Sequence, residues 1–336
     1  MRIVRYAAPR KIEIITAEKP QVSGPDDVLV RIAYAGICDD DIPLYTMDTV
    51  NWPLPSAIAG HEFSGTVEAL GENARKNGFC EGDRVSGQAW LFCGTCHYCK
   101  GGMENHCMNI KCTSVFADYA LLHQKQLCRL PDEVSLEGGA LLDPVTYCLY
   151  NSLYRQNSSA PKVMIFGVNT MSLIMLQLAK KQGAVLVDIA ENDTEKGRLA
   201  LRLGADHVVP AEPAQIAANA MDYTLQYGYD MVYEMSRNPD LLPCAAQILA
   251  RRGTILYSYM YDLTTTNDLS LMELYMKEAV LRPFFLAPYM LEAAASVMRT
   301  LDLKPLISRV YPLEEIRDAF CAHLSQKNIK ILIKMA

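Results

Sequence analysis

The sequence predicts an α/β protein of two domains, one rich in β-strands and one built on a doubly wound parallel sheet. The chain has 336 residues, which is long for one simple core and short for three domains. Up to about residue 145 it shows short, alternating strand patterns separated by Gly, Pro and Asn. Beyond that point strand patterns alternate with helical ones, and this order predicts a parallel sheet with right-handed crossovers.

The first part is expected to form a compact, mostly antiparallel domain with many loops. Residues 27–34 (DVLVRIAY) alternate apolar and polar side chains, as a half-buried strand does. Pro131 ends the last strand pattern of this part. The expected strands are 2–6, 11–15, 27–34, 64–70, 82–86, 117–122 and 127–130.

The second part is expected to wind strands and helices alternately. Helical periodicity over 171–182 is followed by Gly183, and helix 194–203 has Gly204 in the usual capping position. The last fifty residues contain three prolines and two short helical patterns, and they close on a strand at 330–333. The other expected strands are 163–166, 184–189, 206–209, 230–233, 254–258 and 279–282.

Composition excludes several classes of function. Half of the residues are hydrophobic, 21% are charged and the net charge is −6, which is ordinary for a globular protein. No dense Lys/Arg run exists, so we expect no nucleic-acid partner. The N-terminus lacks the apolar core of a signal peptide, and no stretch is long and apolar enough to span a membrane. We therefore expect a cytoplasmic chain with no membrane partner.

The cysteines form one dense cluster. Eleven cysteines, an odd number, without a secretion signal argue against a disulfide framework. Four of them fall within CGTCHYCKGGMENHC, where two-residue spacing lets successive thiolates point at one centre, so we predict a closed structural zinc site in preference to ordinary buried thiols. The four predicted ligands are Cys93, Cys96, Cys99 and Cys107. The packing cysteines are expected to be Cys80, Cys112, Cys128, Cys148, Cys244 and Cys321.

A second, more open set of metal ligands is spread along the chain. Cys38 follows a strand in AYAGICDDD, His61 and Glu62 stand in AGHEFSG, and Asp143 stands in ALLDPVTY. Each of these is weak alone, since a single Gly-His-Glu is more often a loop than a ligand. Together, and beside a cysteine-rich segment, they form a pattern.

A glycine-poor version of the dinucleotide-binding turn follows the strand at 163–166. In the pattern Gly-x-Gly-x-x-Gly only Gly167 remains, with Asn169 and Ser172 at the other positions. Asn169 is expected to carry a side chain into the space where the backbone approaches a pyrophosphate. Asp188, 21 residues after Gly167, is the candidate for binding the ribose, although a solvated strand end is the alternative. No arginine follows Asp188 directly, which favours NAD over NADP.

These motifs resemble those of the zinc-dependent medium-chain alcohol and polyol dehydrogenases over nearly the whole chain. The resemblance is closest to the sorbitol and galactitol-1-phosphate dehydrogenase branch, through Asp41-Ile-Pro43 and the DPVT step. The matching residues are Gly36–Cys38 with Asp41, Gly60-His61-Glu62 with Gly65, Gly82–Val85, the four-cysteine segment and Asp143-Pro144.

The resemblance implies a GroES-like catalytic domain (1–147 and 288–336) and a Rossmann NAD-binding domain (148–287), with the catalytic zinc in the cleft between them. It implies that Cys38 and His61 hold this zinc, with Glu62 and Asp143 as carboxylate ligands, direct or through water. Asp41 would orient His61 through its other ring nitrogen. The expected cofactors are two zinc ions per chain and NAD. The expected reaction is hydride transfer between NAD and a secondary alcohol of a polyol, sugar alcohol or sugar-alcohol phosphate, in a homodimer or homotetramer.

This chain also departs from the family pattern. Asp40 replaces a Ser or Thr that normally passes on the substrate proton. Two interpretations of this carboxylate stay open: it accepts the proton directly as a general base, or its negative charge near the zinc raises the pKa of a bound alcohol and slows the reaction. Asp40 and Glu62 are the predicted catalytic residues. Arg237 and Ser258 replace family glycines, and the altered turn leaves open zinc-assisted lyase or isomerase chemistry without net redox. The residues that choose the substrate are expected in the loops 44–55 and 260–267.

Overall fold

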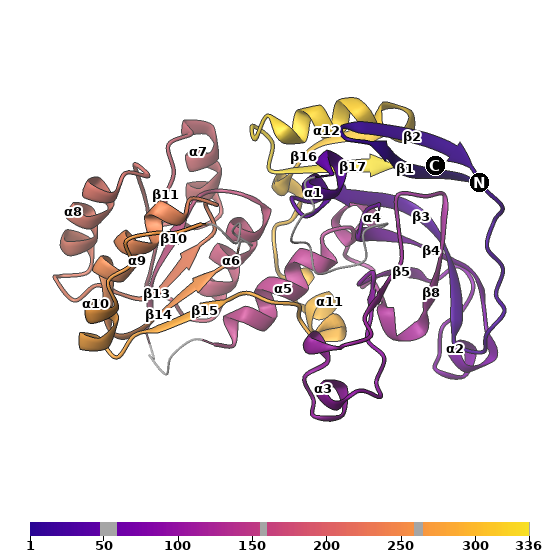
Figure 1. Cartoon of the computed structure of the whole chain (residues 1–336), viewed down its shortest axis with the longest axis horizontal. Coiled ribbons are helices and arrows are strands. Elements are labelled where there is room, and N and C mark those ends of the chain that lie inside the picture. The colour runs from indigo at the N-terminus through magenta and orange to yellow at the C-terminus, as the bar shows by residue number, and fades with distance from the viewer. Residues whose placement is uncertain (48–58, 155–159, 259–264, 336) are drawn as a thin grey trace. The chain divides into compact units, whose positions relative to one another are not determined.

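The computed structural model describes residues 1–47, 59–154, 160–258 and 265–335, and every element below lies in these ranges. The chain divides into two compact units (Figure 1). Unit 1 comprises Met1–Thr146 and Ala287–Ala336, and unit 2 comprises Tyr147–Leu286. Helix α5 (Leu142–Ser152) begins in unit 1 and ends in unit 2.

The main sheet of unit 1 is mixed and has the strand order β16-β17-β3-β4-β5-β9, with β8 also paired to β3. Its central strand is β3, which pairs antiparallel with β4, β8 and β17. Two small ribbons, β1–β2 and β6–β7, accompany it. The strands of unit 1 are β1 (Arg2–Ala8), β2 (Lys11–Thr16), β3 (Asp27–Ile37), β4 (Glu62–Leu70), β5 (Arg84–Gly87), β6 (Trp90–Leu91), β7 (Lys111–Cys112), β8 (Tyr119–His123), β9 (Leu127–Arg129), β16 (Ile307–Pro312) and β17 (Lys330–Lys334).

Alternation along β3 builds the core of unit 1. Val28, Val30 and Ile32 are completely buried, and they belong to one hydrophobic cluster that includes Phe63 and Phe320. The register of β3 and β4 places candidate metal ligands at one edge of the sheet, because Gly36 near the end of β3 pairs with Glu62 at the start of β4. The helices beginning in unit 1 are α1 (Asp41–Thr46), α2 (Glu72–Lys76), α3 (His97–Lys100), α4 (Leu136–Gly139), α5, α11 (Leu291–Met298) and α12 (Ile316–Leu324).

Unit 2 holds the parallel sheet, with strand order β12-β11-β10-β13-β14-β15 (Figure 1). The chain starts at β10, winds outward to β12, and returns to β13 on the other side of β10. This reversal makes the carboxyl ends of β10 and β13 a topological switch point. The elements are β10 (Lys162–Phe166), β11 (Leu186–Ala190), β12 (His207–Val209), β13 (Tyr229–Glu234), β14 (Leu249–Tyr257), β15 (Val280–Pro283), α6 (Thr170–Lys181), α7 (Thr194–Arg202), α8 (Pro213–Tyr223), α9 (Leu242–Ile248) and α10 (Leu271–Met276).

The central strands of unit 2 are apolar because helices cover both faces of such a sheet. In β10, Met164, Ile165 and Phe166 are completely buried. Gly183 and Gly204 both have positive φ values, 91° and 110°, as expected for residues that follow a helix. None of the helices in the described ranges is long and apolar enough to cross a membrane.

Candidate functional site

The four-cysteine segment folds into one sulfur cluster. The ligand atoms of Cys93, Cys96, Cys99 and Cys107 all lie within 4.8 Å of one another. The Cys93 and Cys99 sulfurs are 3.9 Å apart, close to the roughly 3.8 Å between two thiolates on a tetrahedral zinc with 2.3 Å bonds. The ribbon β6–β7 closes the base of this lobe, which lies between its two strands in the sequence. The donor set and its spacing therefore fit a closed zinc site.

Hydrogen bonds already favour a thiolate in this lobe. The Cys93 sulfur accepts hydrogen bonds from the Thr95 hydroxyl (3.5 Å) and from the amides of Thr95 (3.5 Å) and Cys96 (3.3 Å). These bonds, led by that from the Thr95 side chain, lower the pKa of Cys93 to about 5. Burial instead raises the pKa of Cys99 to about 12, so its deprotonation requires a cation.

The second ligand set is assembled at the edge where β3 and β4 meet. The ligand atoms of Cys38, His61 and Glu62 lie within 4.8 Å of one another. A Cβ on Gly36 would stand 2.1 Å from Glu62 Oε2, so only glycine lets the β3 backbone approach this carboxylate. Gly60, at φ 77°, makes the turn that precedes His61.

A buried ion pair that the sequence analysis missed holds Glu62 in place. Lys330 Nζ donates to Glu62 Oε1 (2.8 Å) and Oε2 (2.7 Å) and to the Ile37 carbonyl (3.0 Å). Both side chains are almost fully buried, at 4% and 2% exposure. Burial lowers the pKa of Lys330, but the Glu62 carboxylate outweighs it and the net shift is upward. With both oxygens accepting from Lys330, Glu62 is not a free base; its role as a metal ligand stays a prediction.

Two buried carboxylates, those of Asp41 and Asp143, act electrostatically on the imidazole of His61. Asp41 Oδ2 accepts the Cys38 amide hydrogen (2.8 Å), while its Oδ1 lies 3.7 Å from His61 Nδ1, beyond hydrogen-bond distance. Asp41 Oδ1 and Asp143 Oδ1 are buried and have no hydrogen-bond partner among the described residues. Such orphaned oxygens fit a site completed by a cation.

The closeness of these buried groups shifts the pKa values of Asp143 and His61. Burial raises the pKa of Asp143 to about 7. Burial lowers the pKa of His61, but the carboxylates of Asp41 and Asp143 reverse the shift and raise it. Asp143 nevertheless stands outside the set of ligand atoms that lie within 4.8 Å of one another. Its direct binding to the metal therefore stays a prediction.

The acidic residues after Cys38 have separate environments. Burial raises the pKa of Asp40, which precedes α1 and makes no capping bond with its side chain. Asp39 Oδ1 lies 2.8 Å from His323 Nε2 on α12. Sequence reasoning could not find this pair because its members are 284 residues apart. The role of Asp40 in proton transfer stays a prediction.

The turn after β10 differs from the expectation at Asn169. Its φ of −146° is extended, and the left-handed residue of the turn is Gly167, at φ 81°. The Asn169 side chain turns back into the protein: Nδ2 donates to the Met235 carbonyl (2.7 Å) and Oδ1 accepts from the Ser172 amide (3.0 Å). The Ser172 hydroxyl in turn accepts from the Asn169 amide (2.7 Å). This reciprocal cap explains why Asn and Ser can replace glycines here.

The prediction that Asp188 binds a ribose is wrong. Asp188 lies in the middle of β11, is completely buried, and accepts hydrogen bonds from the Tyr229 hydroxyl (2.5 Å) and from His207 Nδ1 (2.8 Å). The strand continues for two residues beyond it, so the acidic residue at the strand end is Glu191. Glu191 Oε2 accepts the amide hydrogen of Val168 in the turn (2.8 Å).

Comparison with known proteins decides the family. Residues 24–132 match the alcohol dehydrogenase GroES-like domain and residues 171–300 match the zinc-binding dehydrogenase domain. The chain is 30% identical over 325 residues to D-arabitol-phosphate dehydrogenase of Enterococcus avium, covering 92% of this chain and 90% of the relative. The chain belongs to the zinc-dependent medium-chain alcohol dehydrogenase family. It is therefore an NAD(P)-dependent dehydrogenase, and the predicted GroES-like and Rossmann fold class is confirmed.

Two further relatives show that the chain is similar to enzymes with different names. L-threonine 3-dehydrogenase of Paraburkholderia xenovorans is 27% identical over 335 residues, with 96% of this chain and 95% of the relative covered. The crystal structure of a zinc-binding dehydrogenase of Sinorhizobium meliloti, bound to NADP, is 26% identical with a TM-score of 0.91 and 99% of each chain covered. This dehydrogenase thus shares its fold and family with enzymes that differ in their named substrates.

The altered glycines of this dehydrogenase have distinct structures. Arg237 adopts φ 66°, the left-handed conformation that glycine adopts without strain. Ser258 directly follows β14, and its amide donates to the Glu234 carbonyl (3.0 Å).

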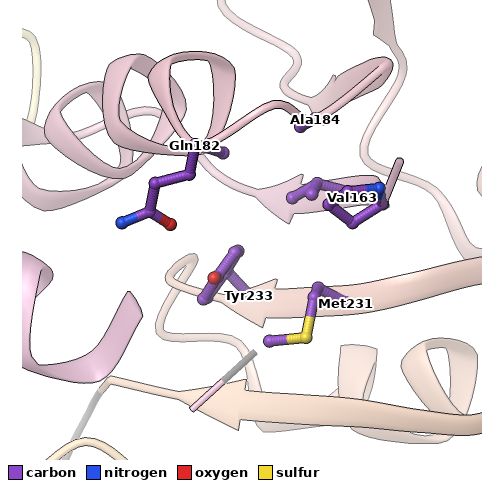
Figure 2. Close-up of a pocket in the computed structure, with 7 residues that line it drawn as sticks. Val163, Gln182, Ala184, Met231 and Tyr233 are labelled. Atoms are coloured by element: carbon purple, nitrogen blue, oxygen red, sulfur yellow. The ribbon is translucent and has the colours of Figure 1, made fainter. Parts of the chain in front are cut away.

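A small hollow beside β10 and β13 is lined by Val163, Met231 and Tyr233 among others (Figure 2). Because its lining contains no carboxylate, histidine or cysteine, we assign it no chemistry.

Proposed function

We propose that this dehydrogenase transfers a hydride between NAD and a secondary alcohol of a polyol, sugar alcohol or sugar-alcohol phosphate. The observation that carries the proposal is the convergence of the Cys38, His61 and Glu62 donor atoms beside two orphaned carboxylate oxygens. The relative named for an arabitol phosphate supports a hydroxylated, phosphorylated substrate. Most of the loops expected to choose the substrate lie outside the described residues, in 48–58 and 259–264.

The candidate residues of unit 1 have different proposed roles at the metal. Cys38 and His61 would hold the catalytic zinc with Asp143, directly or through water, and Lys330 keeps Glu62 close to them. A bound zinc supplies positive charge that makes a neighbouring hydroxyl more acidic. Asp40 would accept the substrate proton. Asp41, 3.7 Å from His61 Nδ1, would orient His61 through the attraction of its carboxylate. A second zinc, in the four-cysteine lobe, would be structural.

NAD is the proposed cofactor because of the acidic end of β11. Glu191 takes the position that the sequence analysis gave to Asp188, since it follows the strand and lies against the turn at Val168. A carboxylate here binds a ribose hydroxyl and repels a 2′-phosphate. The alternative of lyase or isomerase chemistry loses its main support, because the Asn169 side chain points back to Met235 and forms the helix cap.

The decisive assay follows NADH absorbance with zinc-loaded protein over a panel of polyols, their phosphates and threonine. We expect turnover with polyols or polyol phosphates, a preference for NAD over NADP, and two zinc ions per chain by metal analysis. Turnover confined to threonine would overturn the substrate class. No turnover on any hydroxylated substrate, together with no binding of either dinucleotide, would overturn the reaction itself.

We propose further that the chain forms a homo-oligomer through β15 and α10. In the described structure β15 pairs with β14 alone and leaves its other edge open. Two side chains of this strand, Val280 and Leu281, are 44% and 38% exposed. No residue of α10 is buried, and its exposed apolar side chains are Leu271, Met272, Tyr275 and Met276. An open apolar strand edge suits antiparallel pairing with a second copy across a two-fold axis.

A further inference from the structure

Two backbone segments lie in contact at the topological switch point of unit 2. Phe166 of β10 pairs with Glu234 of β13, so residues 167–169 and 235–238 leave the sheet side by side. A Cβ on Gly167 would lie 2.7 Å from the Ser236 Cα. Ligands of such sheets bind at the switch point, outside the carboxyl ends of the strands. Whatever charges the two segments carry therefore act directly on a bound dinucleotide.

Three amides of the turn between β10 and α6 are already occupied in this chain. The Val168 amide donates to Glu191, the Asn169 amide donates to the Ser172 hydroxyl, and the Ser172 amide donates to Asn169. Free amides at the start of a helix are the common way to bind a pyrophosphate. Since three donors of this turn are satisfied within the protein, a basic side chain at the same place would add to the positive charge that the start of α6 presents to a pyrophosphate.

The sequence offers one basic side chain for this task. Among the described residues, the segments that follow the six strands of the sheet are 167–169, 191–193, 210–212, 235–238, 258 with 265–270, and 284–286. These described segments contain a single Lys or Arg, which is Arg237. Their carboxylates are Glu191, Asp193, Glu212 and Asp268. Without Arg237 the carboxyl edge of the sheet would present only negative charge to a dianionic ligand.

The conformation of Arg237 shows that its position is enforced. It adopts φ 66°, which is strained for any residue with a side chain, and such strain gathers at functional sites. The preceding residue is fixed, because the Ser236 amide donates to Glu234 Oε1 (2.8 Å) and the Asn238 amide donates to the Ser236 hydroxyl (3.1 Å). The strain is therefore maintained by the local network of hydrogen bonds.

We propose that Arg237 binds the pyrophosphate of the dinucleotide and adds positive charge beside a turn in which three amides are already occupied. The guanidinium presents several donors in a plane and suits two phosphate oxygens at once. This inference rests on the proposed function, because it assumes that a dinucleotide occupies the switch point. It assigns to this chain a cofactor-binding residue at a position where the family pattern has glycine.

The test measures NADH affinity by calorimetry with the full-length, zinc-loaded protein. Arg237→Gln and Arg237→Gly should both weaken NADH binding about 10- to 100-fold, the range expected for removing hydrogen bonds to a charged group. Arg237→Gly also relieves the positive φ, so its melting temperature should equal or exceed that of the wild type. Arg202→Gln is the matched control, because this exposed arginine ends α7 at the opposite edge of the sheet, and it should leave the affinity unchanged.

Two small probes locate the contact. ADP, which carries a diphosphate, should lose affinity for both Arg237 variants in the same proportion as NADH, whereas adenosine should bind all proteins equally. Unchanged NADH and ADP affinity in both variants would overturn the assignment while leaving the dehydrogenase proposal standing. Weakened binding of NADPH alone would place the arginine at the 2′-phosphate and overturn the pyrophosphate contact. A wild type that binds neither NADH nor NADPH would overturn the proposed function, and this inference with it.

Discussion

The buried Lys330–Glu62 ion pair stabilises the part of unit 1 that carries the candidate ligands Cys38 and His61. Lys330→Met would leave a buried carboxylate without its partner, and breaking such a pair costs about 3–5 kcal/mol. We therefore expect a lower midpoint of urea unfolding for this variant. The double variant Lys330→Met with Glu62→Leu should recover much of the loss, because it buries no unpaired charge. Lys327→Met, at an exposed position, is the control, and an equal loss there would show that the pair is not responsible.

Asp188 and Glu191 should separate in function even though they are three residues apart. Asp188→Asn should leave NADH affinity unchanged, because Asp188 is sealed between Tyr229 and His207. Glu191→Gln should weaken NADH binding and narrow the preference for NAD over NADP. Calorimetry with both cofactors measures this. A loss of affinity in Asp188→Asn that exceeds the loss in Glu191→Gln would restore the original assignment.

The same Asp188 gives a dependence of stability on pH. Burial raises its pKa, and the hydrogen bonds from Tyr229 and His207 only partly offset this. A raised folded-state pKa means that the folded protein binds the proton more tightly than the unfolded chain. Its stabilising contribution is thus present below the unfolded pKa of about 3.9 and is lost as pH rises through the raised value. Unfolding curves of wild type and Asp188→Asn should diverge over this window, and parallel curves would contradict the shift.

At the scale of elements, the sequence predicted local structure better than it predicted contacts between distant residues. The strand and helix periods and the four-cysteine spacing are local, and each predicted element is present close to its expected position. The end of β11 was misjudged because a strand of a parallel sheet is buried on both faces, so alternation does not show where it stops. The partners of Glu62 and Asp39 lie 268 and 284 residues away along the chain. No local signal in one sequence reports such contacts.

The four-cysteine lobe should behave as an element independent of the catalytic ligands. Cys99→Ser removes a buried ligand of the lobe and should reduce the zinc content from two ions to one while lowering thermal stability. Cys38→Ser should also leave one zinc ion, yet with stability nearer that of the wild type and with activity lost. Metal analysis and thermal unfolding of both variants distinguish the sites. Loss of both ions from either variant would show that the two sites are coupled.

At the scale of the whole molecule, the fold leaves one apolar surface that a single chain does not cover in the described structure. Tyr275 of α10 is 79% exposed and Leu281 of β15 is 38% exposed. Tyr275→Glu and Leu281→Glu together should reduce the mass in solution to that of one chain, 37.4 kDa, by light scattering. The physical reason is that charges on a strand edge and its flanking helix oppose pairing with the same surface of a second copy. Leu201→Glu, on α7 at 47% exposure, is the matched control and should keep the oligomer. A wild type that is already monomeric would contradict the assignment, and so would a double variant that keeps the oligomeric mass.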